Sequence, residues 1–428
     1  MYVGNGLVIV LCFFASGRVA LSAEMFLPCI KRHGAAMLNS TRKENATLLG
    51  DVRRRVLLQC VQVHQSRCEP RGVVHVPPWP WGFGSAVNLW IQSFVVALER
   101  GLTLVHDGAF PYADESKCPL NPGFDCYFQP TTTCQTSKST FTAKQYAMSN
   151  LRYGNQLLVR AAKALQVPPG WVWGNLALIL LRLKPFAEVG VTARANFSHL
   201  GFIPERETMA LQIRVGTSAA PINDGREHNR GSSSERFTRM IDEYMRGVQR
   251  LAANKQFSMY IVTDAENVSA DALNERYASL GHHFTVPVRT AVDIGCFDGD
   301  HTKHCIHGIK PPSGRATRAT VTLDLLADIW IMMRADYLLG SDSNLFYLAY
   351  GLRLAQSPHS SIKRSCWMKG SSLLCSGSRQ FLDSFVASRY TSLRAASATC
   401  AEASCGAPGK FKNGEEGRNG GMDQVAAF

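Results

Sequence analysis

Short apolar segments alternate with stretches of helical periodicity between residues 206 and 355, and this alternation constrains the fold more than any other feature. Strands that alternate with helices are typical of a parallel sheet covered by helices on both faces. We therefore predict an α/β fold for this part of the chain. The apolar segments lie at 209–213, 259–262, 284–286 and 337–339, and the helical stretches at 234–254, 270–280, 322–334 and 344–353.

The first half of the chain carries fewer regular patterns. Residues 106–140 hold Cys118, Cys126 and Cys134 among prolines and aromatic residues, which predicts a loop stapled by disulfides. The regular elements expected here are a helix through 52–55, a helix over 87–100, a buried strand over 102–105 and a helical stretch over about 141–187.

Composition and charge narrow the class of protein. The 428 residues are 46% hydrophobic and 18% charged, which is typical of globular domains rather than disordered chains. The formal net charge of +13 suits an anionic partner such as phosphate or a membrane surface, and equally a mixed surface with a basic excess. No long Lys/Arg block or RNA-reading aromatic motif occurs, so nucleic acid is not an expected partner.

The N-terminus predicts entry into the secretory pathway. Residues 6–16 form an apolar run that is short for a membrane span and is interrupted beyond its end by Arg18. Small residues at 20–23 offer a cleavage site. A Golgi-type signal anchor, with Arg18 reaching the membrane interface, is the alternative to a cleaved signal peptide.

Cysteines and glycosylation sequons agree with a lumenal location, and we expect the Golgi. Of the 13 cysteines, one (Cys12) lies in the apolar run, which leaves an even number for disulfide pairing. Four Asn-x-Ser/Thr sequons are candidate glycosylation sites, at Asn39, Asn45, Asn196 and Asn267.

Polar residues follow three of the predicted strands directly. They are Arg214, then Thr263 with Asp264, then Ser341, Asp342 and Ser343. In a parallel sheet, ligands bind outside the carboxyl ends of the strands. An arginine there can stabilise a departing diphosphate, a carboxylate can accept hydrogen bonds from a ribose or a base, and a serine-rich turn opens a helix that favours an anion.

Each of these residues also has an ordinary structural interpretation. Spacing alone favours a plain loop arginine at Arg214. A helix cap explains Asp264 nearly as well, and N-capping explains Ser341 and Ser343 about as well as anion binding does.

Two further motifs are weaker. The Gly82-x-Gly84 turn could let the backbone approach a ligand, but no clear strand precedes it in the sequence. The cluster from Cys296 to Cys305 contains Asp298 and Asp300, in a pattern like the DxD of metal-dependent transferases, together with two histidines. Cys and His at these spacings could hold zinc, but a disulfide between Cys296 and Cys305 is the favoured interpretation in an oxidising compartment. The DxD interpretation is weak because that motif follows a buried strand, and 291–295 makes a poor one.

Four segments of the chain together resemble the fucosyltransferase superfamily that includes the α-1,6-fucosyltransferases and the bacterial nodulation fucosyltransferases. The most specific is 322–343, a helix followed by an Ala-Asp strand and a serine-rich turn. The others are the Gly-x-Gly turn with its helix and the Thr-Leu strand at 103–105, the strand ending at Arg214, and the strand ending at Thr263-Asp264. The resemblance covers roughly residues 75–355.

The resemblance implies a GT-B-like fold of two Rossmann-like halves, with the donor site in the C-terminal half. It implies an inverting, metal-independent reaction with GDP-fucose as donor, a glycan or glycoprotein as acceptor and no cofactor. Arg214 would be the catalytic residue that holds the β-phosphate. The implied donor-binding residues are Gly82, Gly84, Arg214, Thr263, Asp264, Asp328, Ser341, Asp342 and Ser343.

The chain departs from the family pattern after Arg214. Many relatives have a second arginine there and a downstream glutamate for the acceptor hydroxyl, whereas here Arg214 is followed by Val215-Gly216-Thr217-Ser218. Asp224 or Glu227 is the candidate for the missing base. A pseudoenzyme that binds a GDP-sugar without transfer, and a protein O-fucosyltransferase, remain alternatives.

Five segments are expected along the chain. They are a signal peptide or signal anchor (1–23), a stem or N-terminal cap (24–76), an N-terminal α/β half with a disulfide-rich loop (77–205), a C-terminal nucleotide-sugar-binding α/β half (206–376) and a largely disordered extension (377–428).

Overall fold

A computed structural model of the chain describes residues between Phe26 and Cys375, with interruptions. The longest internal ones are 143–150, 216–231, 296–307, 311–317 and 357–364. Every described residue belongs to one compact unit of the chain, and the extension expected over 377–428 lies outside the described residues. Among the described residues, no helix combines the length and the apolar character needed to cross a membrane.

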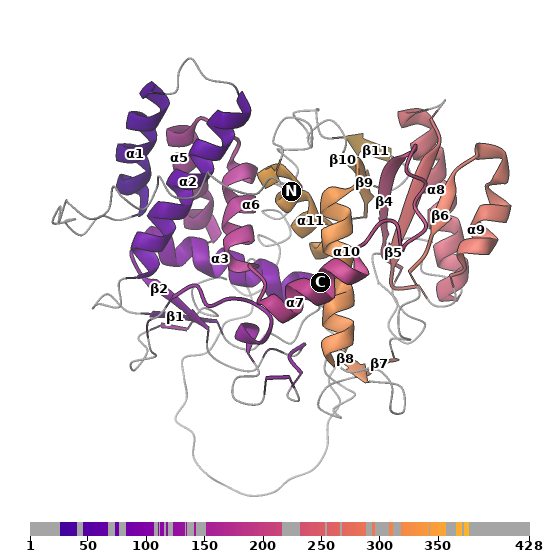
Figure 1. Ribbon diagram of the computed structural model, residues 1–428, viewed down its shortest axis with the longest axis horizontal. Coiled ribbons are helices and arrows are strands. Elements are labelled where there is room, and N and C mark those ends of the chain that lie inside the picture. Colours follow the sequence, from indigo (N-terminus) through magenta and orange to yellow (C-terminus); the bar gives the residue numbers. More distant parts are fainter. Residues whose placement is uncertain are drawn as a thin grey trace, which may run out of the picture. The chain divides into compact units, whose positions relative to one another are not determined.

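A six-stranded sheet forms the centre of the C-terminal half (Figure 1). Its order is β11-β10-β9-β4-β5-β6, and all neighbours are parallel except the β10–β11 pair. The central strand, β4, lies between two parallel neighbours, and its buried part from Met209 to Ile213 is apolar apart from Gln212. The predicted α/β fold with a parallel sheet is therefore confirmed. The strands are β4 (Glu207–Ile213), β5 (Phe257–Thr263), β6 (His283–Thr285), β9 (Tyr337–Gly340), β10 (Ser365–Lys369) and β11 (Ser372–Cys375).

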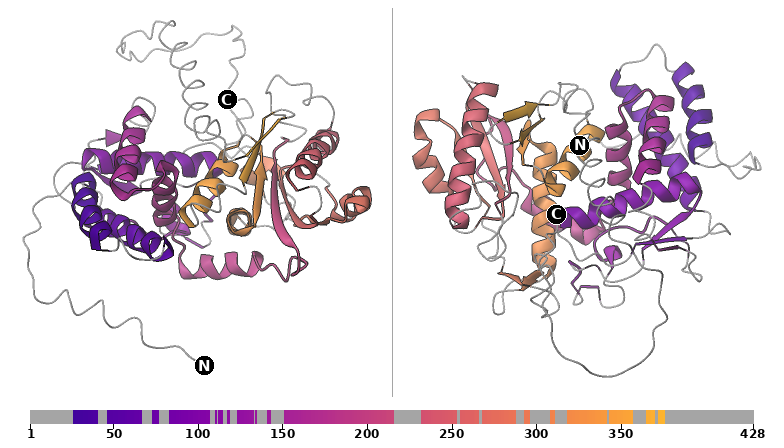
Figure 2. Two further views of the ribbon diagram at one scale, coloured as in Figure 1. Left: turned by 90° about the horizontal axis from the view of Figure 1, so that it is seen from above. Right: turned by 180° about the vertical axis from the view of Figure 1, so that it is seen from behind.

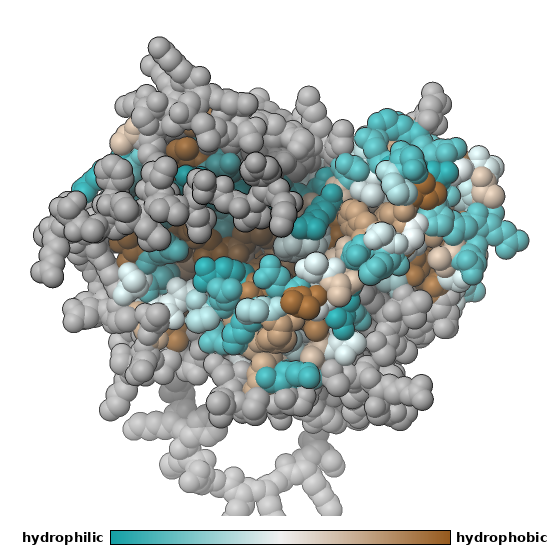
Figure 3. Space-filling view, in the orientation of Figure 1, coloured by the Kyte–Doolittle hydropathy of each residue, from teal (hydrophilic) through white to brown (hydrophobic). Residues whose placement is uncertain are grey.

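Helices cover both faces of this sheet. Figures 1 and 2 show α8 (Ser233–Leu251) and α9 (Ala270–Arg276) on one face, and α10 (Arg318–Arg334) and α11 (Asn344–Gln356) on the other. Alternate residues of β4 belong to the core under α8, including Met209, Leu211 and Ile213. The outer sides of α8 and α9 are hydrophilic in the space-filling view of Figure 3, as expected of helices that separate a sheet from solvent.

The β10–β11 hairpin at the edge of the sheet was not predicted. Its strands are short, and the register pairs Cys366 with Cys375, which form a disulfide. Short strands of mixed polarity carry little period-2 signal, so the pattern along the chain does not distinguish them from a loop.

The N-terminal half contains its own three-stranded parallel sheet, in the order β2-β1-β3. The strand β1 (Val73–Val76) comes before α3 (Phe83–Arg100), so the expectation that no clear strand precedes the Gly-x-Gly turn was wrong. A four-residue strand followed by prolines is too short to stand out in the sequence. The other two strands are β2 (Thr103–His106) and β3 (Phe141–Thr142).

Helices of the N-terminal half replace the single helical stretch expected over 141–187. After β3 come α5 (Leu151–Leu165), α6 (Pro169–Leu180) and α7 (Pro185–Arg194). Prolines at the first positions of α6 and α7 start new helices, because proline lacks the N–H that a continuing helix would need. The 3-10 turn η2 (Phe124–Cys126) is closed by the Cys118–Cys126 disulfide, as expected for a stapled loop.

Two further helices precede β1. They are α1 (Phe26–Ser40) and α2 (Ala46–Gln65), and the Cys29–Cys60 disulfide joins them. Arg54 of α2 donates hydrogen bonds to Asn175 of α6 (3.0 Å) and to the carbonyl oxygen of Ala355 in α11 (2.5 Å). One arginine thus connects three helices that lie far apart in the sequence.

The two halves meet through buried polar contacts and close helix packing. The Thr322 hydroxyl at the start of α10 donates to the Tyr112 carbonyl oxygen, at 2.8 Å. The Asp114 carboxylate accepts from the backbone N–H of Ala319, at 3.0 Å, and so satisfies a free donor in the first turn of α10. The ion pair between Arg194 and Asp324, at 2.8 Å, ties α7 to α10.

Candidate functional site

The carboxyl ends of β4, β5 and β9 lie next to one another. In the register of the sheet, Ile213 pairs with Thr263 and Gln212 pairs with Gly340, so the residues that follow each strand share one edge. The structure therefore brings together Arg214, Asp264 and Ser341, three of the residues predicted for a site. The Arg214 side chain is exposed at this edge.

Asp264 ties the end of β5 to the end of β4. Its carboxylate accepts a hydrogen bond of 2.7 Å from the backbone N–H of Val215, the residue after Arg214. The hydroxyl of Thr263 accepts from the N–H of Ala265 at 3.0 Å, which closes a local turn. Asp264 is therefore no cap of α9: that role belongs to Ser269, which accepts from Ala272 N–H.

Gln212 organises the serine-rich turn after β9. Its side-chain oxygen accepts from the Ser341 hydroxyl (3.1 Å) and from the Ser343 hydroxyl (2.9 Å). Its backbone oxygen accepts from the Ser341 N–H (3.1 Å) and from the buried Tyr244 hydroxyl (3.0 Å). A single buried glutamine thus fixes the turn. Burial also raises the pKa of Tyr244 above its ordinary value, although a hydrogen bond with Ser341 acts in the opposite direction.

Ser343 caps helix α11. Its hydroxyl oxygen accepts from the N–H of Phe346, three residues later, in the ordinary N-cap geometry. The hydroxyl protons of Ser341 and Ser343 are directed at Gln212. An anion at this turn would therefore be bound by backbone N–H groups rather than by these two hydroxyls.

The electrostatic influence of Arg214 reaches the N-terminal half. Burial raises the pKa of Tyr112 well above its ordinary value, and a backbone hydrogen bond with Phe83 and the positive charge of Arg214 both oppose that rise. The rings of Phe83 and Tyr112 also meet edge to face at 5.3 Å. Because Phe83 opens α3, the first turn of that helix, with buried Gly84, lies on the same side of the molecule as Arg214.

Asp328 lies inside the C-terminal half rather than at the strand ends. It is 6% exposed, and its carboxylate accepts a 2.7 Å hydrogen bond from the Tyr260 hydroxyl in the middle of β5. This contact pairs α10 with the sheet. Asp328 therefore lies apart from the other residues that were predicted to bind the donor.

Several predicted residues lie outside the described part of the chain. They are Gly82, Asp224, Glu227, Asp342, Asn45, Asn267 and the segment from Cys296 to Cys305. Asn39 lies in α1, and Asn196 accepts hydrogen bonds from the N–H (3.1 Å) and the hydroxyl (2.6 Å) of Ser198, within its own sequon.

The segment before Asp298 forms only a short strand outside the parallel sheet. It is β7 (Asp293–Gly295), which pairs antiparallel with β8 (Gly308–Lys310) in a separate two-stranded sheet. It is no buried strand of the parallel sheet, which is where a DxD motif would be expected. Within the described ranges, no group of His, Cys, Asp and Glu side chains is arranged to hold a metal ion.

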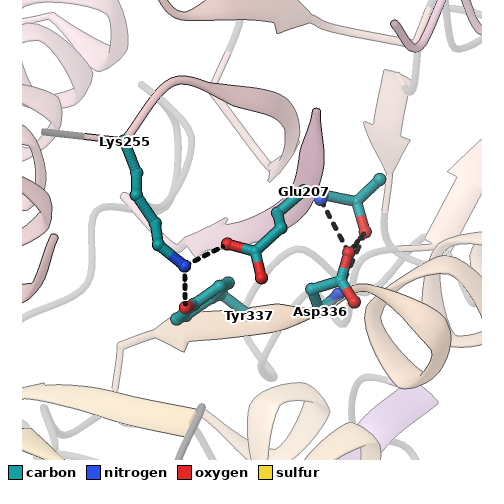
Figure 4. Close-up of polar contacts among 5 residues, drawn as sticks. Glu207, Lys255, Asp336 and Tyr337 are labelled. Carbon is teal, nitrogen blue, oxygen red and sulfur yellow. Dashed lines mark hydrogen bonds and ion pairs between the residues drawn. The ribbon is translucent and has the colours of Figure 1, made fainter. Parts of the chain in front are cut away.

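A second polar cluster lies at the opposite, amino-terminal edge of the large sheet (Figure 4). Lys255 donates to the Glu207 carboxylate at 2.6 Å, and Asp336 accepts from the N–H (2.9 Å) and the hydroxyl (3.0 Å) of Thr208. These contacts join the beginnings of β4, β5 and β9. They hold the strands together at the edge where ligands do not usually bind in such sheets.

Sequence reasoning missed Gln212, Tyr244 and Arg236. Gln212 was detectable in principle, because a glutamine inside an otherwise apolar strand must find partners when it is buried. Tyr244 and Arg236 look like ordinary helix residues in the sequence. Arg236 is 3% exposed and donates from Nε to the carbonyl oxygen of Val215, at 3.2 Å.

Fold and site define the chain as an α/β protein with polar residues, among them Arg214 and Asp264, at the carboxyl edge of a parallel sheet. No protein-family model matches the sequence, and no curated protein matches it.

Solved structures that resemble the chain do so distantly. A mutant of Arabidopsis thaliana FUT1 in complex with GDP is 12% identical, with 82% of this chain and 81% of that chain covered and a TM-score of 0.42. The fucosyltransferase NodZ from Bradyrhizobium is 11% identical over 72% of this chain and 100% of its own, with a TM-score of 0.40. POFUT1 in complex with GDP is 15% identical over 69% and 98%, with a TM-score of 0.36. At identities and TM-scores this low, the likeness supports no conclusion about this chain.

Proposed function

We propose that the chain is an inverting glycosyltransferase that transfers fucose from GDP-fucose to a glycan or glycoprotein without a metal ion or another cofactor. The observation that carries the proposal is the position of Arg214. Its exposed guanidinium follows the central strand of a parallel sheet, next to Asp264 and to the capped N-terminus of α11. The sequence resemblance described above supplies the donor and the reaction.

Arg214 would stabilise the leaving group. In an inverting transfer, the acceptor hydroxyl attacks the anomeric carbon as the bond to the GDP oxygen breaks, and negative charge grows on the β-phosphate. A guanidinium that is always charged and presents forked donors binds such an oxyanion well. The N–H groups at the start of α11 would add to the positive potential, because a helix N-terminus favours an anion.

The remaining roles follow the sequence pattern. Thr263 and Asp264 would hold the nucleoside, while Asp328, bonded to Tyr260 in the middle of β5, would support that strand from behind. The segments at Gly82 and Gly84 and at Ser341, Asp342 and Ser343 would approach the donor through backbone. Asp224 or Glu227, which come between β4 and α8 in the sequence, would accept the proton of the acceptor hydroxyl.

The proposed location is the lumen of the Golgi, either free or behind an N-terminal membrane anchor. Three described disulfides support an oxidising compartment, since cytosolic proteins seldom keep such bonds. They are Cys29–Cys60, Cys118–Cys126 and Cys366–Cys375.

A GDP-sugar-binding protein without transfer activity is the second candidate. It is favoured by Val215, whose buried apolar side chain occupies the position directly after Arg214, where a second arginine would otherwise add charge. Such a protein would keep donor binding and lose turnover.

The test uses the purified chain, GDP-fucose and two acceptor sets, mixed N-glycans and folded acceptor domains for O-fucosylation. Arg214→Ala should lose turnover by about a hundredfold or more, because it removes a donor aimed at the developing charge. Arg246→Ala, at an exposed arginine on the outer side of α8, is the matched control and should keep wild-type turnover. An Arg214→Ala protein as active as wild type would refute the mechanism.

Calorimetry with GDP separates the two candidates. GDP binding together with fucose transfer supports the enzyme, and GDP binding without transfer to either acceptor set supports the non-catalytic protein. A chain that binds no GDP contradicts both. Transfer that persists in EDTA is expected, and its loss would show that a metal ion takes part.

A further inference from the structure

The backbone of Val215 is held from both sides by charged side chains of other elements. The Asp264 carboxylate accepts from its N–H at 2.7 Å, and the Arg236 guanidinium donates from Nε to its carbonyl oxygen at 3.2 Å. The Val215 side chain is 3% exposed and belongs to the core under α8. We call Asp264, Val215 and Arg236 the Val215 clamp.

Arg236 occupies a position that is unfavourable for a cation. It is 3% exposed, and burial of a charged group is costly unless the group is well bonded. It also lies in the first turn of α8, where the positive end of the helix dipole repels a cation. A cation at such a position needs contacts that offset the cost of burial and the repulsion by the helix dipole.

Capping of α8 does not depend on Arg236. The Ser232 side chain accepts from the Glu235 N–H, and the Glu235 carboxylate accepts from the Ser232 N–H, so a complete capping box already closes this end of the helix. The bond from Arg236 to Val215 is instead a tertiary contact, 21 residues apart in the chain, that joins the helix to the residue after Arg214.

We propose that Arg236 is a positioning residue for Arg214, an inference that rests on the proposed function. Hydrogen bonds that a carboxylate accepts or a guanidinium donates are stronger than neutral ones, so the clamp fixes the backbone on both sides of Val215. The direction in which Arg214 leaves the strand depends on that backbone. With Val215 fixed, the exposed Arg214 guanidinium is held toward the diphosphate and loses less freedom when GDP binds.

A double-mutant cycle tests this role. GDP dissociation constants are measured for wild type, Arg236→Gln, Arg214→Ala and the double variant, with titrations that extend to millimolar GDP. Arg236→Gln should weaken GDP binding by about tenfold or more, as expected when a binding group loses its support. In the Arg214→Ala background, the same change should cost no more than about twofold, because two residues that act as a unit do not add.

Folding controls accompany the cycle. Thermal unfolding of each variant identifies any that is not folded, and Arg236→Lys, which keeps the charge but not the fork, should recover part of the affinity. Asp264→Asn keeps an acceptor oxygen for the Val215 N–H and should weaken GDP binding less than Asp264→Ala. Arg236→Met, which removes the donors but keeps a long unbranched side chain, repeats the cycle with Arg214→Ala if Arg236→Gln does not fold.

The outcomes are distinguishable from failure of the proposed function. A wild-type chain that binds no GDP overturns the proposed function, and the inference with it. A wild-type chain that binds GDP, with equal losses from Arg236→Gln in the presence and absence of Arg214, overturns the inference alone, because Arg236 would then act independently.

Discussion

The hydroxyl of Thr322 donates a 2.8 Å hydrogen bond to the backbone carbonyl oxygen of Tyr112, 210 residues earlier in the chain, and both side chains are buried. The same carbonyl oxygen accepts from the Tyr127 hydroxyl at 3.1 Å. The Tyr112 hydroxyl, in turn, lies within the electrostatic reach of Arg214. Tyr112 therefore takes part in a contact between the two halves and is also influenced by the charge of Arg214 at the candidate site.

Replacement of Thr322 by valine should destabilise the fold by about 1 kcal/mol, the usual contribution of one buried hydrogen bond. Valine keeps the shape of threonine and removes only the donor. Urea unfolding measures the change. Thr238→Val, which removes a comparable 3.0 Å bond from an exposed hydroxyl on α8, is the control and should change stability by less than about 0.5 kcal/mol. Equal effects of the two substitutions would contradict the tertiary role of Thr322.

Replacement of Ser343 by alanine should cost about 1–2 kcal/mol, because it removes the cap of α11 together with the bond to Gln212. Chemical denaturation compares it with Ser269→Ala, which removes the exposed cap of the seven-residue helix α9, a bond of 3.4 Å. The Ser269 variant should lose less stability. A larger loss at Ser269 would show that the buried turn is not supported by Ser343.

Gly174→Ala should destabilise the protein by about 2–3 kcal/mol through overpacking. A Cβ atom at Gly174 would lie 1.9 Å from the carbonyl oxygen of Gly351, which belongs to the backbone of α11 and cannot move aside as a side chain can. Gly50→Ala is the matched control, since nothing lies within 4 Å of its added Cβ. It should raise the melting temperature, because alanine stabilises a helix interior by about 0.5–1 kcal/mol over glycine.

The pH dependence of stability should reveal the Asp242 contacts. Burial opposes ionisation of Asp242, but hydrogen bonds from Tyr277 and Arg276 outweigh it, so the pKa of this carboxyl is held below its ordinary value. A pKa that is lower in the folded state adds stability above the unfolded value of about 3.9, and that stability is lost as pH falls through the folded pKa.

Urea unfolding of wild type and Asp242→Asn from pH 7 to pH 2.5 measures this. The wild-type advantage should be constant from pH 7 to about pH 5 and should shrink as pH falls below about 4. The effect should be modest, because the Asp242 side chain is 35% exposed. An advantage that grows in acid would contradict the assigned sign.

The inner strands of the C-terminal sheet were predictable because each contains a short buried run with a clear end. β4, β5 and β9 are covered on both faces, so each contains a run of mainly apolar residues, and a polar residue follows each run. The same logic fails for β1, β10 and β11. These are short, and β1 and β10 lie beside prolines or residues of mixed polarity, so no periodicity develops along them.

The candidate site could be predicted as a set of positions but not as a set of contacts. Strand ends identified Arg214, Asp264 and Ser341, since parallel strands place their carboxyl ends on one edge. The sequence did not show that Asp264 binds the Val215 backbone or that Asp328 pairs with Tyr260. Each contact joins two elements that are far apart in the sequence, and their separation along the chain does not reveal which side chains meet.

Taken alone, the sequence determined which residues stand at the ends of the inner strands, because the local pattern of apolar and polar residues indicates where buried strands alternate with covering helices. Tertiary structure alone decided what those residues contact. Arg236 is an ordinary helix arginine until α8 packs on the sheet and brings its guanidinium to Val215. Burial and hydrogen bonding between distant elements arise only when the chain closes on itself, so the support beneath Arg214 is a property of the packed molecule.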